Sequence, residues 1–152
     1  MDTGDLAPDF ELPDQDGAQR KLTTLLVEGG PVVLFFYPAA MSPGCTAESC
    51  HFRDLAKEFA AVGAQRVGIS GDRVEVQSEF ADRHSLDYPL LSDTDGLVAA
   101  EYGVKRRLGP LAVKRHTFVI DVDRRVLAVI RSELRMSVHA DKALAVLHNR
   151  TA

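Results

Sequence analysis

The chain has 152 residues, of which 45% are hydrophobic and 26% are charged, and its formal net charge is −4. This length and composition fit one globular domain, residues 1–152, that can bury its own hydrophobic core. The negative charge argues against a partner nucleic acid, and no apolar run approaches the roughly 20 residues that span a bilayer, which argues against a membrane partner. The first residues lack the basic start and apolar stretch of a signal peptide, so we expect a cytoplasmic protein.

Apolar, β-rich segments alternate along the chain with helical patterns, which predicts an α/β protein. Two short segments around the turn at 14–17 predict an N-terminal hairpin, with its return strand at 19–22. The nearly all-apolar run at 31–37 predicts a strand that is covered on both faces, at the centre of a sheet. Further strands are predicted at 65–70, 89–92, 116–121 and 126–130, further helices at 74–84, 97–102 and 140–147, and a basic connection at 105–115.

One helix is predicted directly after the central strand. Ser42 is a good N-cap, Pro43 suits the first helical position, and Gly63 suits the end. Phe52, Leu55, Ala56 and Phe59 repeat at three- and four-residue spacing, which predicts a single core-facing stripe. The order of the elements predicts a three-layer fold like that of thioredoxin, with a mixed central sheet and helices on both faces.

The only two cysteines, Cys45 and Cys50, both lie in this helix. Cys45 falls in the first turn, where unpaired backbone N–H groups and the helix dipole favour a thiolate. Cys50 lies about 140° further round the helix, on a more polar face. Their Cα atoms should be roughly 8 to 9 Å apart, whereas a disulfide needs roughly 4.4 to 6.8 Å. The pair therefore cannot form a disulfide while the helix is intact, and the first turns must unwind if it does.

Other readings of the pair remain open on spacing alone. The cysteines fit two unrelated small side chains on a helix, or a metal site with His51, although a CxxC pair and a second ligand cluster are missing. A dithiol reductase of the thioredoxin type normally needs two residues between its cysteines, and here there are four. The remaining polar and aromatic candidates are interpreted as surface histidines at His51, His84, His139 and His148 and as packing residues at Tyr88 and Tyr102.

The region around the cysteines resembles a known family. Pro38, Ser42 and Cys45 follow the peroxiredoxin active-site pattern of Pro, three residues, Thr or Ser, two residues, Cys. The longer run 36–54 is similar to the peroxiredoxin Q subfamily, also called bacterioferritin comigratory protein. Further similar segments lie at 4–10, 12–17, 88–93, 102–104 and 115–121.

The resemblance implies a thioredoxin-like fold and a thiol peroxidase that works without metal or haem. It implies that Cys45 is the peroxidatic cysteine and Cys50 the resolving cysteine, and that Pro38, Ser42 and Arg115 complete the peroxide pocket. Glu48 would help to organise the helix and the arginine. Thioredoxin or a similar dithiol is the expected reductant, and the subfamily suggests a monomer or weak homodimer.

Two other functions use the same cysteines. A redox-responsive binding or chaperone protein would use the pair as a switch that exposes apolar helix surface. A general dithiol oxidoreductase would reduce disulfides of the insulin type, which we do not expect of this chain.

Overall fold

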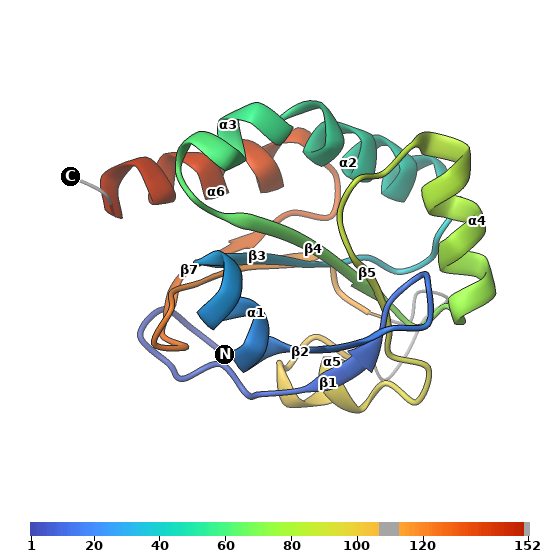
Figure 1. Ribbon diagram of the computed structural model, residues 1–152, viewed down its shortest axis with the longest axis horizontal. Helices are drawn as coiled ribbons and strands as arrows, with labels where there is room; N and C mark the ends of the chain where they lie inside the picture. Colours follow the sequence, from blue (N-terminus) through green and yellow to red (C-terminus); the bar gives the residue numbers. More distant parts are fainter. Residues whose placement is uncertain (107–112, 151–152) are drawn as a thin grey trace.

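The computed structural model describes residues 1–106 and 113–150, so the predicted basic connection at 105–115 lies largely outside the described residues. A five-stranded sheet, in the order β5-β4-β3-β6-β7, forms its centre (Figure 1). The strands are β3 (Val32–Phe36), β4 (Gln65–Ser70), β5 (Leu90–Ser92), β6 (His116–Ile120) and β7 (Val126–Arg131). β3, β4 and β5 run parallel, whereas β6 pairs antiparallel with both β3 and β7. The predicted mixed sheet with a fully buried central strand is confirmed.

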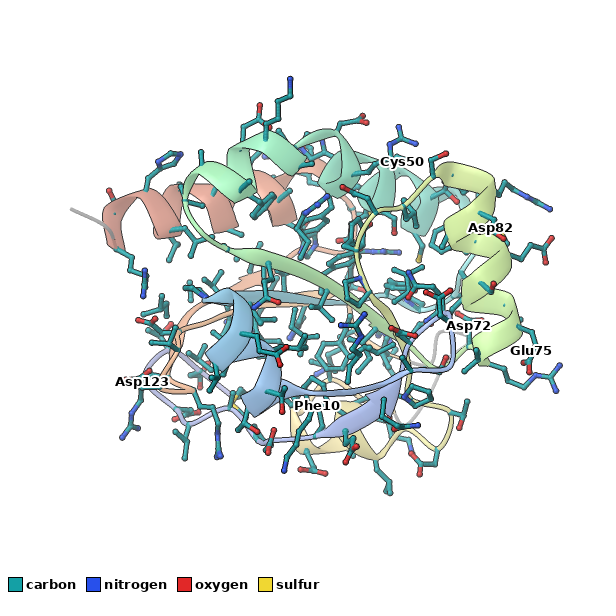
Figure 2. The ribbon with its side chains drawn as sticks, viewed as in Figure 1. Phe10, Cys50, Asp72, Glu75, Asp82 and Asp123 are labelled. Atoms are coloured by element: carbon teal, nitrogen blue, oxygen red, sulfur yellow. The ribbon has the colours of Figure 1, made fainter. Side chains whose placement is uncertain are left out.

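Helices cover both faces of this sheet (Figure 1). One face carries α2 (Pro43–Asp54), α3 (Ala56–Ala61), α4 (Val74–His84) and α6 (Ser137–Arg150). The other carries α1 (Leu22–Gly29), α5 (Leu97–Glu101) and the hairpin of β1 (Glu11–Pro13) and β2 (Gln19–Lys21). Side chains fill the spaces between the layers (Figure 2), and β3 supplies both cores in alternation: Leu34 points to the α1 side and Phe35 to the α2 side.

The structure differs from the sequence prediction at two helices. The chain turns into α1 at Leu22, where we predicted the end of a strand, and no helix was predicted over Leu22–Gly29. The single helix predicted from Pro43 to Gly63 is two helices. Leu55 has a non-helical backbone conformation (φ −97°, ψ 21°) and separates α2 from α3. The break leaves α2, with both cysteines, as a separate helix of 12 residues.

None of the helices within residues 1–106 and 113–150 combines the length and the apolar character needed to cross a membrane.

Candidate active site

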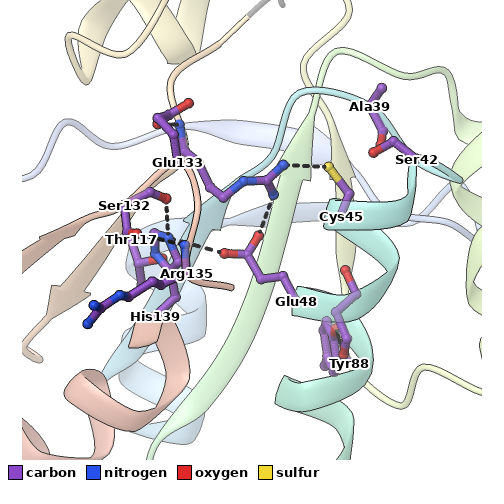
Figure 3. Close-up of polar contacts among 12 residues, drawn as sticks. Ala39, Ser42, Cys45, Glu48, Tyr88, Thr117, Ser132, Glu133, Arg135 and His139 are labelled. Carbon is purple, nitrogen blue, oxygen red and sulfur yellow. Dashed lines mark hydrogen bonds and ion pairs between the residues drawn. The ribbon is translucent and has the colours of Figure 1, made fainter. Parts of the chain in front are cut away.

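The site begins in the turn between β3 and α2. Met41 adopts a left-handed backbone conformation (φ 70°), which is costly for a residue other than glycine. Two hydrogen bonds hold the turn in this shape: the Ala40 N–H donates to Asp72 Oδ2 (2.7 Å), and Ser42 Oγ donates to Ala39 O (2.8 Å; Figure 3). Ser42 occupies the predicted N-cap position of α2, but its hydroxyl makes no capping bond to the helix. Its proton is used within the turn instead.

Cys45 is the third residue of α2 and is fully buried. The first N–H of the helix that bonds back to the preceding chain is that of Thr46, to Ser42 O (2.9 Å). The Cys45 N–H therefore lies in the part of a helix start where backbone donors have no intrahelical partner. Arg115, 70 positions further along the chain, donates from Nη2 to Cys45 Sγ (3.3 Å). A guanidinium group and the positive end of a helix thus meet at one buried sulfur atom, an arrangement that stabilises a thiolate.

Arg115 is held in place by two acidic groups. Its Nη1 donates to Glu48 Oε1 (3.0 Å), one turn further along α2, and its backbone N–H donates to Glu133 Oε2 (2.7 Å). Arg115 is 7% exposed and Glu48 is fully buried, so water competes weakly for these contacts. The fork of the guanidinium group therefore spans from the carboxylate to the sulfur, as Figure 3 shows for Glu48 and Cys45.

The prediction that His139 is a surface residue is wrong. The ring is fully buried at the start of α6, and its Nε2 donates to Ser132 O (2.8 Å). Because a carbonyl oxygen only accepts, Nδ1 carries no proton in the neutral ring and accepts from the Thr117 hydroxyl (2.7 Å). Nε2 also lies 3.6 Å from Glu48 Oε2, which has no hydrogen-bond partner among the described residues. His139 thus lies on the side of the Glu48 carboxyl group that does not contact Arg115 (Figure 3).

Burial shifts the pKa values of Glu48 and His139 in opposite directions. It raises the pKa of Glu48 to about 8, against the opposing attraction of Arg115. Burial also lowers the pKa of His139, even though the bond to Ser132 favours the charged ring, and Arg115 adds to the lowering. With His139 neutral, Arg115 is the cation that faces Glu48 and Cys45.

The other predicted site residues lie around this centre. Cys50 is half-buried on another face of the intact α2, and both cysteines are free thiols. Pro38 is half-buried and lines, with Asp72 and Asp93, a cavity of about 350 Å³ beyond the carboxyl ends of β3, β4 and β5. Cys45 is not part of the cavity wall.

A metal site was one open reading of the cysteine pair. Across the described parts of the chain, no three His, Cys, Asp or Glu side chains are grouped as metal ligands. His51, which the metal reading required, pairs through Nε2 with Asp141 Oδ1 (2.8 Å) on α6.

Sequence reasoning missed the roles of Asp72, Thr117 and Ser132. A signal for Asp72 was present, because it follows β4 at the edge where the neighbouring parallel strand β3 ends and the active-site turn begins. Thr117 and Ser132 carry no local signal, since each acts only through His139, and Ser132 contributes a backbone carbonyl rather than its side chain.

A thioredoxin-like layer arrangement with a buried cysteine at a helix start, facing a buried arginine, defines the class of thiol-dependent peroxidases. The model of the AhpC/TSA family matches residues 3–129, and the chain belongs to this family. The crystal structure of peroxidoxin BcpB from Mycobacterium tuberculosis is 64% identical and superposes with a TM-score of 0.94, covering 98% of this chain and 97% of that one.

Two further relatives agree. Peroxiredoxin Bcp of Escherichia coli is 40% identical over 149 residues, covering 95% of this chain and 94% of its own. Peroxiredoxin Q of Xanthomonas campestris is 29% identical with a TM-score of 0.85, covering 94% of this chain and 92% of that one. The predicted family, fold and enzyme class are confirmed: the protein is a thiol peroxidase that acts on peroxides with a thioredoxin-type reductant.

Proposed function

We propose that Cys45 is the residue that reduces the peroxide, and the contact of Arg115 Nη2 with Cys45 Sγ (3.3 Å) carries this assignment. The thiolate attacks one peroxide oxygen, the O–O bond breaks, and the products are a sulfenic acid on Cys45 and an alkoxide or hydroxide that takes up a proton. Arg115 lies where negative charge passes from sulfur to the leaving oxygen, so it stabilises the transition state as well as the thiolate.

Ser42 contributes to the peroxide site next to Cys45 as an acceptor rather than as a donor. Its hydroxyl proton is donated to Ala39 O. The lone pairs of Ser42 Oγ remain available to accept the O–H of a hydroperoxide and orient it. Pro38 shields the pocket from water and has no N–H to compete for the thiolate.

We propose that Cys50 resolves the sulfenic acid. The Cys50 thiol condenses with Cys45–SOH, giving the Cys45–Cys50 disulfide and one water molecule. Both cysteines lie on the intact α2, so this step requires the helix to unwind. A dithiol such as thioredoxin then reduces the disulfide by thiol exchange.

The setting of the reaction is part of the proposal. The enzyme acts in the cytoplasm as a monomer or weak homodimer, and a peroxide and a dithiol reductant are its only required partners. The Xanthomonas campestris bacterioferritin comigratory protein, a structural relative, has alkyl peroxide reduction activity, which supports organic hydroperoxides as substrates here. Light scattering after size-exclusion chromatography tests the oligomeric state.

A coupled assay with thioredoxin, thioredoxin reductase and NADPH tests the assignment of the cysteines, using hydrogen peroxide and an organic hydroperoxide in parallel. We expect Cys45→Ser to abolish peroxide consumption with both substrates. Cys50→Ser should consume one equivalent of peroxide, stop at the sulfenic acid and fail to turn over with thioredoxin. A first turnover that survives in Cys45→Ser and is lost in Cys50→Ser would reverse the two roles.

A further inference from the structure

The second half of α2, which carries Cys50, forms hydrogen bonds with residues outside the helix. The Tyr88 hydroxyl donates to the backbone carbonyl of Ser49 (2.7 Å), and Arg66 Nη1 donates to that of Phe52 (3.0 Å). In the reverse direction, Arg53 Nη1 donates to His84 O (2.7 Å). These contacts are separate from the contacts of Arg115 with Cys45 and Glu48, which hold the first half of the helix.

Tyr88 has little freedom to release its partner. It is 4% exposed, directly ahead of β5, and Figure 3 shows it beside the second half of α2. The Arg66 guanidinium group lies over the Tyr88 ring at 4.9 Å from its centre, and the ring of Phe35 packs edge-on at 5.8 Å. The ring is therefore fixed with its hydroxyl directed at Ser49 O. Burial strongly raises the pKa of Tyr88, so the hydroxyl keeps the proton that it donates.

Ser49 itself favours opening of the helix at this point. Its Oγ is buried and has no hydrogen-bond partner among the described residues. Such a hydroxyl is destabilising in the helical form and gains a partner when the segment becomes hydrated. The bond from Tyr88 to the carbonyl of the same residue opposes this tendency.

We propose that Tyr88, supported by Arg66, is a positioning residue that keeps α2 helical around Cys50 and thereby sets the rate of the resolving step. This inference rests on the proposed roles of Cys45 and Cys50. When α2 unwinds, the Ser49 carbonyl leaves and the buried Tyr88 hydroxyl loses its partner, which penalises the open form. Tyr88 and Arg66 therefore slow disulfide formation without contacting the sulfur atom that reacts with peroxide.

A slower resolving step has a chemical consequence. The sulfenic acid on Cys45 has two fates: it condenses with the Cys50 thiol, releasing water, or it reacts with a second peroxide, giving a sulfinic acid and the alcohol. The longer α2 stays helical, the larger the fraction that takes the second route. Tyr88 thus makes the enzyme more sensitive to inactivation at high peroxide concentration.

The experiment compares Tyr88→Phe with Tyr102→Phe. Tyr102 is a matched control, because it is 1% exposed and its hydroxyl also donates to a backbone carbonyl, that of Pro8, at 2.7 Å, but in the core on the opposite face of the sheet. Rapid quenching followed by intact-protein mass spectrometry separates the reduced, sulfenic, disulfide and sulfinic forms. We expect Tyr88→Phe to form the disulfide about 3- to 10-fold faster, the factor of one ordinary hydrogen bond.

Two further measurements distinguish a specific effect of Tyr88 on α2 from general destabilisation of the fold. The rate of sulfenic acid formation should be unchanged in Tyr88→Phe, and the sulfinic fraction per turnover should fall by the factor by which disulfide formation rises. In a Cys50→Ser background, Tyr88→Phe should leave the rate of sulfinic acid formation unchanged, because no resolving step competes there.

Unchanged or slower disulfide formation in Tyr88→Phe would overturn the role of Tyr88, as would an equal acceleration in Tyr102→Phe. In each case the Cys45–Cys50 disulfide would still form, and the proposed function would stand. If no Cys45–Cys50 disulfide formed in the wild-type protein, the proposed role of Cys50 would fail first.

Discussion

The fork of Arg115 donates to two acceptors at once, and Arg115→Lys tests whether both contacts are needed for peroxide reduction. In the wild-type protein Nη2 reaches Cys45 Sγ at 3.3 Å while Nη1 reaches Glu48 Oε1 at 3.0 Å. A lysine keeps the positive charge, but its single ammonium group cannot reproduce the two directed bonds of the planar fork. Either the sulfur or the carboxylate therefore loses its donor.

The size of the effect follows from the burial of the site. Arg115 is 7% exposed, so water does not readily replace the missing donor. Removal of one donor that stabilises transition-state charge costs about 10²- to 10³-fold in rate, or about 2.7 to 4 kcal/mol. Because a lysine retains part of the electrostatic attraction, we expect the second-order rate of peroxide attack to fall by about 10- to 1,000-fold.

Rapid-quench measurement of sulfenic acid formation at pH 7 tests this directly, with hydrogen peroxide as substrate. Arg131→Lys is the matched control, because Arg131 forms an exposed ion pair with Asp2 and does not contact the site. We expect the control to react at the wild-type rate and both variants to form the disulfide at the wild-type rate once the sulfenic acid is present. An unchanged rate of peroxide attack in Arg115→Lys would refute the role given to the fork.

Three further predictions concern the helix and its buried charges. In the disulfide form, hydrogen exchange followed by mass spectrometry should show faster exchange over residues 38–60 than in the reduced form, while Phe35 and Val119 in the central sheet stay protected; equal protection would contradict unwinding of α2. The folded-state pKa of Glu48, about 8, lies above the ordinary value of 4.5, so its stabilising effect is complete below pH 4.5 and is lost as the pH rises through 8. Urea unfolding should therefore show Glu48→Gln gaining stability relative to the wild type between pH 5 and 8, and a constant difference would refute this. The pKa of His139 lies below 6.5, so the stability it confers is present above pH 6.5 and is lost on acidification; His139→Gln should flatten the acid limb of the stability curve, and an unaltered limb would exclude His139 from it.

Much of the fold was predictable because the signals are local. β4 and α4 have the bounds predicted from sequence, since an apolar run and a helical stripe with a clear end mark them. The start of α2 was likewise marked by Ser42 and Pro43, which placed Cys45 in the first turn. The contact between Cys45 and Arg115 was not marked by any local pattern, because it joins residues 70 positions apart, and it was expected only from the family resemblance.

The failures have physical causes. α1 carries Leu22, Leu25 and Leu26 at helical spacing, but its N-cap residue, Lys21, makes no capping bond. The cap comes from Asp9, whose Oδ1 accepts from the Thr23 N–H (3.1 Å) 14 positions further along the chain, so no local start signal was present. The helix break at Leu55 falls within a continuous apolar stripe. The carbonyl oxygen of Phe52, three residues earlier, accepts hydrogen bonds from the Leu55 N–H (3.3 Å) and from Arg66, which is distant in the sequence. Because the bond from Arg66 is a tertiary contact, the local sequence pattern does not predict the break.

His139 was missed because the predicted last helix began three residues too late, which left His139 just outside it. α6 begins at Ser137, and on the longer helix His139 lies four residues before the buried Ala143, on the core-facing side. A helix start placed at 140 removed His139 from that face. The partners that make burial of the ring tolerable, Thr117 and Ser132, come from β6 and the segment after β7, which only the folded chain brings together.

The two halves of α2 meet opposite demands. In the proposed mechanism, peroxide attack needs the first half intact, so that Cys45 stays buried against Arg115, whereas disulfide formation needs the helix to open between the cysteines. The structure separates these demands in space: the buried contact between Arg115 and Glu48 holds the first half, and hydrogen bonds from Tyr88 and Arg66 to backbone carbonyls hold the second. The break at Leu55 then limits how far an opening can spread into α3, whose Phe59 remains in the core. In the proposed mechanism, the rate of attack and the rate of resolution are therefore set by different contacts of one short helix, so each rate can change without the other.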